Sequence, residues 1–270
     1  MKLTVLGCRG SMSVEGSEYA AFGGATSSYF VESDKPDGGN VYLDAGTGIV
    51  AAPNVEGEIN VLISHPHLDH IQGIPFFPEL LEKGTKINIY VGTDEAHEGY
   101  DAAAAINNLV SPPYWPVGLS AYPADVRVIK VFFPIDIKGL KVSAMEGSHP
   151  GGSLIFGIEQ DGQKLVYATD YEKTEESVEE LIEFAKDADI FMLDGQYTDE
   201  ELGARKGYGH TSWNGALELA GRAHAKTLMI IHHDPAHNDD ILSAAEKELT
   251  EKAGDDIKVI FARKGMILKI

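Results

Sequence analysis

The chain has 270 residues, of which 43% are hydrophobic, and its 22 basic and 42 acidic side chains give a formal net charge of −20. This length allows a substantial core, whereas the negative charge opposes unguided attraction to nucleic acid or to an anionic membrane surface. The single cysteine, Cys8, permits no internal disulfide, and no run approaches the ~20 apolar residues that span a bilayer. We therefore expect a cytoplasmic protein with a small or locally recognised substrate and no membrane contact.

The first half of the chain predicts strands that are separated by Gly-rich turns. The strands are short and rich in β-branched or aromatic residues, and they are expected at residues 3–6, 28–31, 41–43, 60–64 and 87–91. Pro75 and Pro78 interrupt any long helix, so only a short helix fits over residues 79–83, before Gly84.

The segment 93–122 differs from its surroundings. Residues 101–110 have an Ala-rich helical core, and an aromatic and proline-rich turn follows at 112–116. Two interpretations stay open: the segment is an insertion or a lid, or its aromatic side chains simply pack on the core.

The second half predicts strands that give way to alternating strands and helices. Strands are expected over 126–133 and 140–145, followed by a hairpin whose two-residue turn is Asp161-Gly162. Later strands are expected at 189–193 and 227–231. Helices are expected after a cap at Thr174, over 213–224, and from 239 to Gly254, and a final hairpin is expected over 258–270. The pattern favours one domain, 1–270, with two sheets and outer helices.

Four potential metal ligands lie within six positions directly after the apolar strand that ends near Ser64. They are His65, His67, Asp69 and His70. A strand that ends in a turn can direct these groups into one small volume, and imidazole and carboxylate suit zinc, iron or manganese. The alternative is a surface loop that is rich in His by chance.

Further polar residues stand where other strands should end. His149 follows the strand 140–145, Asp170 follows 164–168, and His232 and His233 follow 227–231. Each has an ordinary explanation: a loop His is commonly solvated, Asp170 can cap a helix, and one of the two adjacent His is surplus in any metal site. Their combination with the 65–70 cluster is harder to explain in this way.

Together these residues resemble the metallo-β-lactamase superfamily of metal-dependent hydrolases, whose H-x-H-x-D-H motif is matched at 65–70. The resemblance implies an α/β fold, a four-layer αββα sandwich of two mixed sheets with outer helices. It further implies that Asp44 orients a ligand His. One metal ion would be held by His65, His67 and His149, a second by Asp69, His70 and His232, with Asp170 as the bridge.

The choice of His232 over His233 depends on a closer comparison. His232-His233-Asp234-Pro235 is similar to the H-x-S-P ending of ribonuclease Z relatives, which places the ligand at the first His.

A second resemblance concerns the reaction. Gly209-His210-Thr211-Ser212 is similar to the H-S-T motif of the ribonuclease Z group of phosphodiesterases, and Asp194 falls where that group has an acidic partner for this His. The resemblance implies that protonated His210 binds a phosphoryl oxygen or protonates the leaving alkoxide. The alternative is that His210 only makes local hydrogen bonds at a helix entry.

These features predict an enzyme with two divalent metal ions, zinc foremost, with manganese or iron also compatible with the nitrogen and oxygen ligands. Two such ions can activate water and share the charge of an in-line displacement, with Asp69 accepting a proton. The leading hypothesis is a phosphodiesterase for a small or cyclic phosphodiester of the cyclic-nucleotide type. Since the chain lacks a basic arm, nucleic acid is disfavoured as a substrate. Alternatives are a lactonase or thioesterase, or a non-catalytic metal- and nucleotide-binding module, and a homodimer stays open.

Overall fold

The computed structural model describes residues 1–55 and 57–270, and two mixed sheets dominate it. In the first sheet, β14 lies beside β1 and the other strands follow in chain order: β1 (Lys2–Gly7), β2 (Ser28–Glu32), β3 (Asn40–Leu43), β4 (Glu58–Leu62), β5 (Lys86–Val91), β6 (Asp125–Lys130) and β14 (Ile267–Lys269). The second sheet also keeps chain order from edge to edge: β7 (Ile135–Ile137), β8 (Leu140–Gly147), β9 (Ser153–Gln160), β10 (Gln163–Ala168), β11 (Ile190–Asp194), β12 (Thr227–Ile231) and β13 (Lys258–Phe261).

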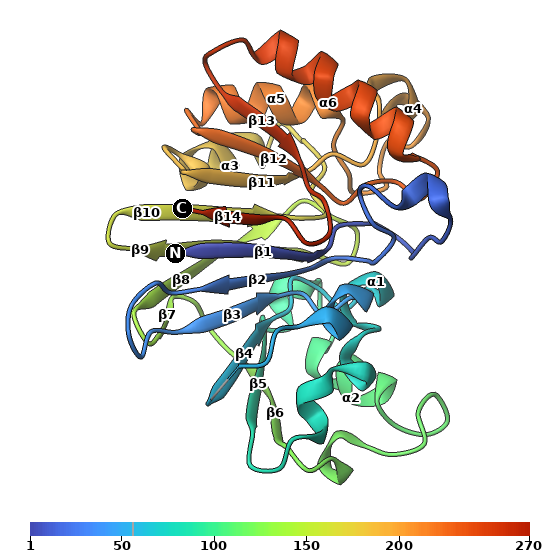
Figure 1. Ribbon diagram of the computed structural model, residues 1–270, viewed down its shortest axis with the longest axis vertical. Helices are drawn as coiled ribbons and strands as arrows, with labels where there is room; N and C mark the ends of the chain where they lie inside the picture. Colours follow the sequence, from blue (N-terminus) through green and yellow to red (C-terminus); the bar gives the residue numbers. More distant parts are fainter. Residues whose placement is uncertain (56) are drawn as a thin grey trace.

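Helices cover the outer faces of the two sheets. The α-helices are α1 (Leu68–Ile71), α2 (Ala102–Leu109), α3 (Val178–Ala185), α4 (Asp199–Ala204), α5 (Trp213–Arg222) and α6 (Asp239–Ala253). Single 3-10 turns are η1 (Ser17–Tyr19), η2 (Thr47–Ala51), η3 (Ile74–Phe76), η4 (Pro78–Leu81), η5 (Glu95–His97) and η6 (Leu119–Ala121). Figure 1 shows α3 to α6 at one side of the molecule and α1 and α2 at the opposite side. Within the described residues, no helix has the length and apolar character that crossing a membrane requires.

Three apolar layers hold this arrangement together. The central layer lies between the sheets and contains Leu43 from the first sheet with Phe156 and Met192 from the second, all fully buried. A second cluster packs α3, α5 and α6 on the outer face of the second sheet, and a third packs α2 and the short 3-10 turns on the outer face of the first. The predicted αββα sandwich is therefore confirmed.

Two local predictions are wrong. The final segment is not a hairpin, because β13 pairs with β12 in the second sheet whereas β14 crosses to the first sheet and pairs with β1. Thr174 is not the N-cap of α3 either. The cap position is Ser177, and the Thr174 hydroxyl instead accepts a hydrogen bond from the Ser177 amide at 3.2 Å.

The sheet topology brings several strand ends to one edge of the molecule. β3 runs parallel to β4, and β10, β11 and β12 are mutually parallel. Because parallel strands present their carboxyl ends at a common edge, the residues that follow these strands converge there. Three of the residues just beyond strand ends, Asp44, Asp170 and His232, have positive φ angles of 57°, 50° and 60°. Such angles are uncommon outside glycine and concentrate at functional sites.

Candidate metal centre

The converging strand ends gather every predicted metal ligand into one cluster. His65, His67, Asp69 and His70 follow β4, Asp170 follows β10, His232 follows β12, and His149 lies in the turn between β8 and β9. All of them are buried except His67, which is exposed. The sequence prediction thus named residues that the fold does bring together.

The two carboxylate oxygens of Asp170 face different groups of imidazoles. Its Oδ2 lies 3.6 Å from His65 Nε2 and 3.7 Å from His149 Nε2. Its Oδ1 lies 3.2 Å from His70 Nε2 and 3.1 Å from His232 Nε2. A carboxylate placed in this way is arranged as a bridge between two adjacent sites.

Each site is completed by one more side chain. His67 Nδ1 lies 2.9 Å from His65 Nε2 and 3.1 Å from His149 Nε2. Asp69 Oδ2 lies 3.2 Å from His70 Nε2 and 3.1 Å from His232 Nε2. The grouping is the one that the family resemblance implies for each ligand.

Spacings of 2.9 to 3.7 Å between these donor atoms also fit joint binding of a metal ion. Ligands about 2.0–2.1 Å from a tetrahedral zinc ion are separated from one another by roughly 3.3 Å. The buried Nε2 atom of His70 has no hydrogen-bond partner among the described residues. The nitrogen and oxygen donors would hold two divalent ions, and the donor set admits zinc, manganese and iron alike.

The structure distinguishes the two adjacent His at the end of β12. The His232 ring points into the cluster, where Gly10 lies so close that a Cβ atom there would stand 2.4 Å from the ring. The His233 ring points the opposite way. Its Nε2 donates a hydrogen bond of 2.9 Å to the Ala262 carbonyl, the ring stacks on Phe261, and burial lowers its pKa to about 3. Only His232 is placed to act as a ligand.

Asp44 fixes the orientation of one imidazole, as the resemblance implies. Its carboxylate, fully buried, accepts hydrogen bonds from His70 Nδ1 at 2.7 Å and from the Tyr167 hydroxyl at 2.6 Å. The amide and hydroxyl of Ser64 donate to the same carboxylate at 2.7 and 2.8 Å. His70 Nδ1 is therefore the protonated nitrogen, and its Nε2 lone pair faces the cluster.

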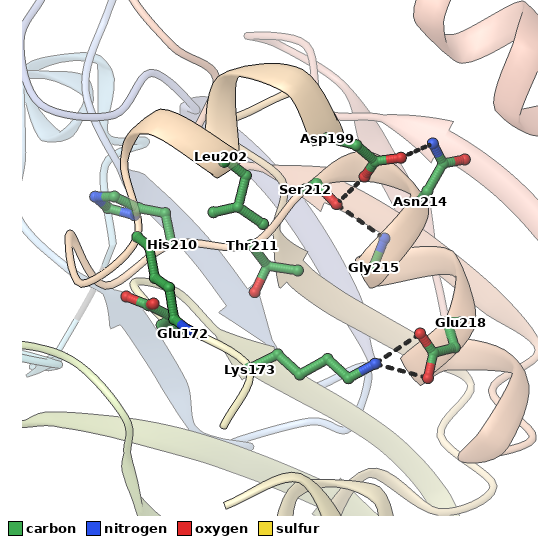
Figure 2. Close-up of a pocket in the computed structure, with 12 residues that line it drawn as sticks. Glu172, Lys173, Asp199, Leu202, His210, Thr211, Ser212, Asn214, Gly215 and Glu218 are labelled. Atoms are coloured by element: carbon green, nitrogen blue, oxygen red, sulfur yellow. Dashed lines mark hydrogen bonds and ion pairs between the residues drawn. The ribbon is translucent and has the colours of Figure 1, made fainter. Parts of the chain in front are cut away.

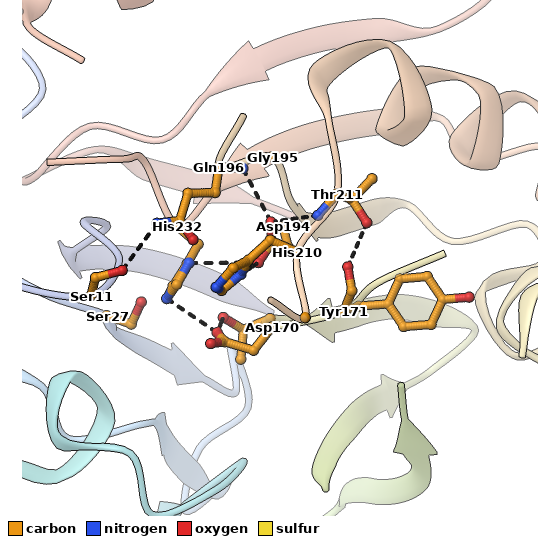
Figure 3. A network of polar contacts seen from close by, with 12 residues as sticks. Ser11, Ser27, Asp170, Tyr171, Asp194, Gly195, Gln196, His210, Thr211 and His232 are labelled. Atoms are coloured by element: carbon orange, nitrogen blue, oxygen red, sulfur yellow. Dashed lines mark hydrogen bonds and ion pairs between the residues drawn. The ribbon is translucent and has the colours of Figure 1, made fainter. Parts of the chain in front are cut away.

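His210 lies beside the cluster (Figure 3). With Asp170, Asp194 and His232 it forms a further set of donor atoms within 4.8 Å of one another, but it is not among the ligands that the resemblance implies. Its Nδ1 is 2.7 Å from Asp194 Oδ2, and its ring stacks on that of His232 with 5.0 Å between the centroids. Burial alone would lower the pKa of His210, but the Asp194 carboxylate outweighs burial, and with smaller contributions from Asp170 and Asp69 it raises the pKa to about 9. Metal ions would cancel the effect of the two ligand carboxylates, whereas Asp194 lies outside both groups.

Sequence reasoning missed the side chain that fixes the loop in front of His210. The Glu172 carboxylate accepts hydrogen bonds from the amides of Gly207 and Gly209, at 2.8 and 2.9 Å. The Gly209 carbonyl in turn accepts a hydrogen bond from His149 Nδ1 at 3.0 Å, which leaves His149 Nε2 directed at Asp170. Gly209 has φ +88°, and a Cβ atom there would stand 1.9 Å from His149 Nδ1. Of these residues in front of His210, only Gly209 belongs to a motif that the sequence analysis identified, Gly209-His210-Thr211-Ser212.

A cavity of about 510 Å³ lies behind His210 but does not extend the cluster. Figure 2 shows the His210 ring pointing away from the other residues that line the cavity. Polar groups in the cavity are paired with one another: Lys173 with Glu218 at 2.6 Å, and Asn214 with Asp199 at 2.7 Å.

Comparison with known proteins establishes the family. Residues 39–233 match the family described as Beta-lactamase superfamily domain. The chain belongs to the metallo-β-lactamase superfamily, and its buried His and Asp cluster is that of a metal-dependent hydrolase.

Named relatives are distant. An uncharacterized protein of Mycobacterium leprae is 27% identical over 257 residues, which cover 92% of this chain and 83% of the relative. A ribonuclease Z of Clostridium perfringens is 23% identical over 270 residues, with 75% of this chain and 82% of the relative covered.

Solved structures share the fold at low identity. The metallo-beta-lactamase fold protein YhfI of Bacillus subtilis superposes with a TM-score of 0.71 at 20% identity, covering 99% of this chain and 98% of that one. A diphosphatase from the PhnP family superposes with a TM-score of 0.68 at 17% identity, covering 100% and 97%. At these identities the structures support the fold alone.

The geometry at the end of β12 leads to a metal-content prediction. His232→Ala should lose about one metal ion per chain, because it removes a ligand of one group and leaves the other complete. His233→Ala is the matched control: it should keep both ions but lose about 2–4 kcal/mol of stability, since a buried ring is removed. Atomic emission and thermal unfolding measure the two effects. Full metal occupancy in His232→Ala would refute the assignment.

Proposed function

We propose that this hydrolase is a phosphodiesterase that acts on a small or cyclic phosphodiester, of the cyclic-nucleotide type. The observation that carries the proposal is His210: a buried imidazole beside the cluster, paired with Asp194 and outside both ligand groups. A phosphodiester releases an alkoxide that must gain a proton, and a buried imidazolium beside the cluster is placed to supply it.

Each residue then has a defined part in the reaction. Two divalent ions, when bound, would supply activated water and neutralise charge on the phosphoryl oxygens. Asp69 would accept the proton of the attacking water. As the new phosphorus–oxygen bond forms and the bond to the leaving oxygen breaks, His210 would donate its Nε2 proton to that oxygen. Asp194, on Nδ1, would keep the ring oriented and favour its charged form.

The names of two relatives support phosphate chemistry without establishing it here. One is called a ribonuclease Z and the other a diphosphatase, and both names describe reactions at phosphate. Fold alone does not fix the reaction, so the support from His210 is the more specific.

Charge favours a small substrate over RNA. The chain carries −20 overall, and the segment 93–122, which includes α2, contains four acidic residues and no Lys or Arg. A protein that holds an RNA backbone commonly neutralises several phosphates with Lys and Arg. The proposed partner is therefore a small phosphodiester.

The first prediction is phosphodiester cleavage that depends on the metal cluster. With added manganese or zinc, the protein should release p-nitrophenolate from bis-p-nitrophenyl phosphate and open a cyclic nucleotide, and His67→Ala should abolish both, because it removes a ligand. The exposed His224 provides a matched control, since His224→Ala should be fully active. The proposal fails if the wild-type protein cleaves no phosphodiester with either metal.

The second prediction separates phosphodiester from carboxylic ester chemistry. His210→Ala should lower kcat on a cyclic nucleotide, whose alkoxide leaving group needs a proton, by about 10²-fold or more, the usual scale of general acid catalysis, and leave the metal content intact. Release of p-nitrophenolate, which leaves without protonation, should change far less. A lactone or thioester substrate should barely respond to the same change. An enzyme that cleaves lactones or thioesters, but no phosphodiester, and is insensitive to His210→Ala would be a lactonase or thioesterase instead.

The third prediction concerns pH. Asp194 raises the pKa of His210 above its ordinary value of 6.5, so kcat on a cyclic nucleotide should fall as the pH rises through that raised pKa. The same shift stabilises the fold below the ordinary pKa of 6.5, and that stabilisation is lost as the pH rises through about 9. Asp194→Asn removes the charge that raises the pKa, so the alkaline fall in kcat should move to lower pH. A pH profile that is identical in Asp194→Asn and wild type, at equal metal content, would contradict the role of Asp194.

A further inference from the structure

A second cavity, of about 600 Å³, opens directly on the metal cluster. We call it the Tyr100 cavity. His65 and His67 form its inner end, whereas His210 lines a different cavity and packs on His232. A group in the Tyr100 cavity would therefore approach the cluster from the side of His65 and His67. Its volume falls within the range of about 300–1,000 Å³ that is typical of small-molecule sites.

Most of the wall is apolar and one aromatic ring stands in it. Pro66, Ala104 and Pro150 contribute apolar surface, and the Tyr100 ring, from the turn before α2, is 61% exposed. One edge of this ring faces Gly151, where an added Cβ atom would lie 3.7 Å away. Most of the ring surface is open to a planar partner.

The position of Tyr100 is tied to the loop that carries a metal ligand. The Gly151 amide donates a hydrogen bond of 3.1 Å to Glu98. Gly152 packs so closely on the 93–101 turn that a Cβ atom there would stand 2.5 Å from the Ala96 carbonyl oxygen. Both glycines belong to the loop of His149, so the aromatic ring and the cluster are held in a fixed relation.

The Tyr100 cavity offers a second anion no Lys or Arg side chain among the described residues that line it. Asp101 lines it instead. The nearby Lys130 is already paired with Asp94 at 2.7 Å and with Asp101 at 2.9 Å. Asn108, also in the wall, offers an amide that can donate and accept hydrogen bonds. The cavity thus suits a flat, uncharged group with polar edges.

We propose that the Tyr100 cavity binds a nucleobase, or an aromatic group of the same kind, on the ester substituent that stays with the phosphate. The inference rests on the proposed phosphodiesterase function and specifies its substrate as a mononucleotide diester. Tyr100 stacks on the base, and the cluster holds the phosphate. A further phosphate on the same side would face Asp101, so an RNA chain does not fit.

A pair of chromogenic substrates tests the proposal. Thymidine 5′-p-nitrophenyl phosphate and methyl p-nitrophenyl phosphate share a leaving group but retain a nucleoside or a methyl group. Wild-type protein should prefer the nucleotide substrate in kcat/KM, and Tyr100→Ala should reduce that preference by about tenfold, within the usual range for loss of a base stack. Tyr100→Phe should keep the preference. Tyr114→Ala is the matched control, because Tyr114 lies in the same segment, is 75% exposed and does not line the cavity.

A binding experiment keeps the inference separate from the proposed function. In calorimetric titrations of the metal-loaded protein, AMP should bind more tightly than ribose 5-phosphate, and Tyr100→Ala should reduce this ratio by about tenfold. If both substrates are cleaved but Tyr100→Ala leaves the two ratios unchanged, the nucleobase site is refuted and the phosphodiesterase stands. If neither substrate is cleaved with either metal, the phosphodiesterase fails, and the ratio of AMP to ribose 5-phosphate alone decides the nucleobase site.

Discussion

The structure depends on how the Asp170 carboxylate is neutralised. The side chain is 2% exposed and lies within 3.7 Å of four imidazoles, from β4, β12 and the turn after β8. Burying an ionised carboxylate without compensation is very costly, and protonating four adjacent imidazoles would replace that cost with mutual repulsion. Divalent ions remove both problems, because neutral imidazoles and ionised carboxylates can then surround the same positive charges. Divalent ions therefore suit this arrangement of strand ends.

The second constraint is the connection of this cluster to the core between the sheets. Asp44 ends β3, Ser64 ends the turn after β4, and Tyr167 belongs to β10 of the opposite sheet, yet all three meet at one carboxylate. A fully buried hydrogen-bond network of this kind is stable only when every member is satisfied. The network therefore fixes the spacing of the two sheets at the same point where it orients His70.

The site residues that follow strand ends could be predicted from the sequence. A strand is recognised from a few consecutive residues, and the residue that follows it is then known as well. His65, Asp170 and Asp194 are of this type. The choice between His232 and His233 was not local: the φ of 60° at His232 turns one ring into the cluster, and the next ring packs on Phe261. The crossing of β14 to the first sheet could not be predicted from the sequence either. Arg263-Lys264-Gly265 has the composition of a hairpin turn, and that composition does not show which strand β14 pairs with.

Glu172 and Tyr100 show a different limit of sequence analysis. Neither stands in a motif or at a strand end, and each acquires its place through backbone contacts with a distant loop. Glu172 contacts the amide of Gly209, and Glu98, two residues before Tyr100, contacts the amide of Gly151. A contact with a backbone atom does not require a particular side chain at the contacted residue, so the sequence gives little indication of it. The glycines at close approaches were the only such indication. The interpretation of 93–122 as a lid stays a prediction, while its described residues contribute one wall of the Tyr100 cavity.

A chain with a net charge of −20 is proposed here to bind an anion. The short range of electrostatic interactions in salt solution makes this possible. Two divalent ions offset by the charges of Asp69 and Asp170 leave about two positive charges at the centre, whereas the charge of protonated His210 is offset by Asp194. At physiological ionic strength, interactions between exposed charges decay over about 8 Å. A phosphate seated at the cluster therefore experiences the local positive charge more than the acidic surface. A polyanion that extends further must cross that surface, including Glu98 and Asp101 beside the cavity. Under the proposed function, the acidic surface would favour single phosphates over nucleic acid.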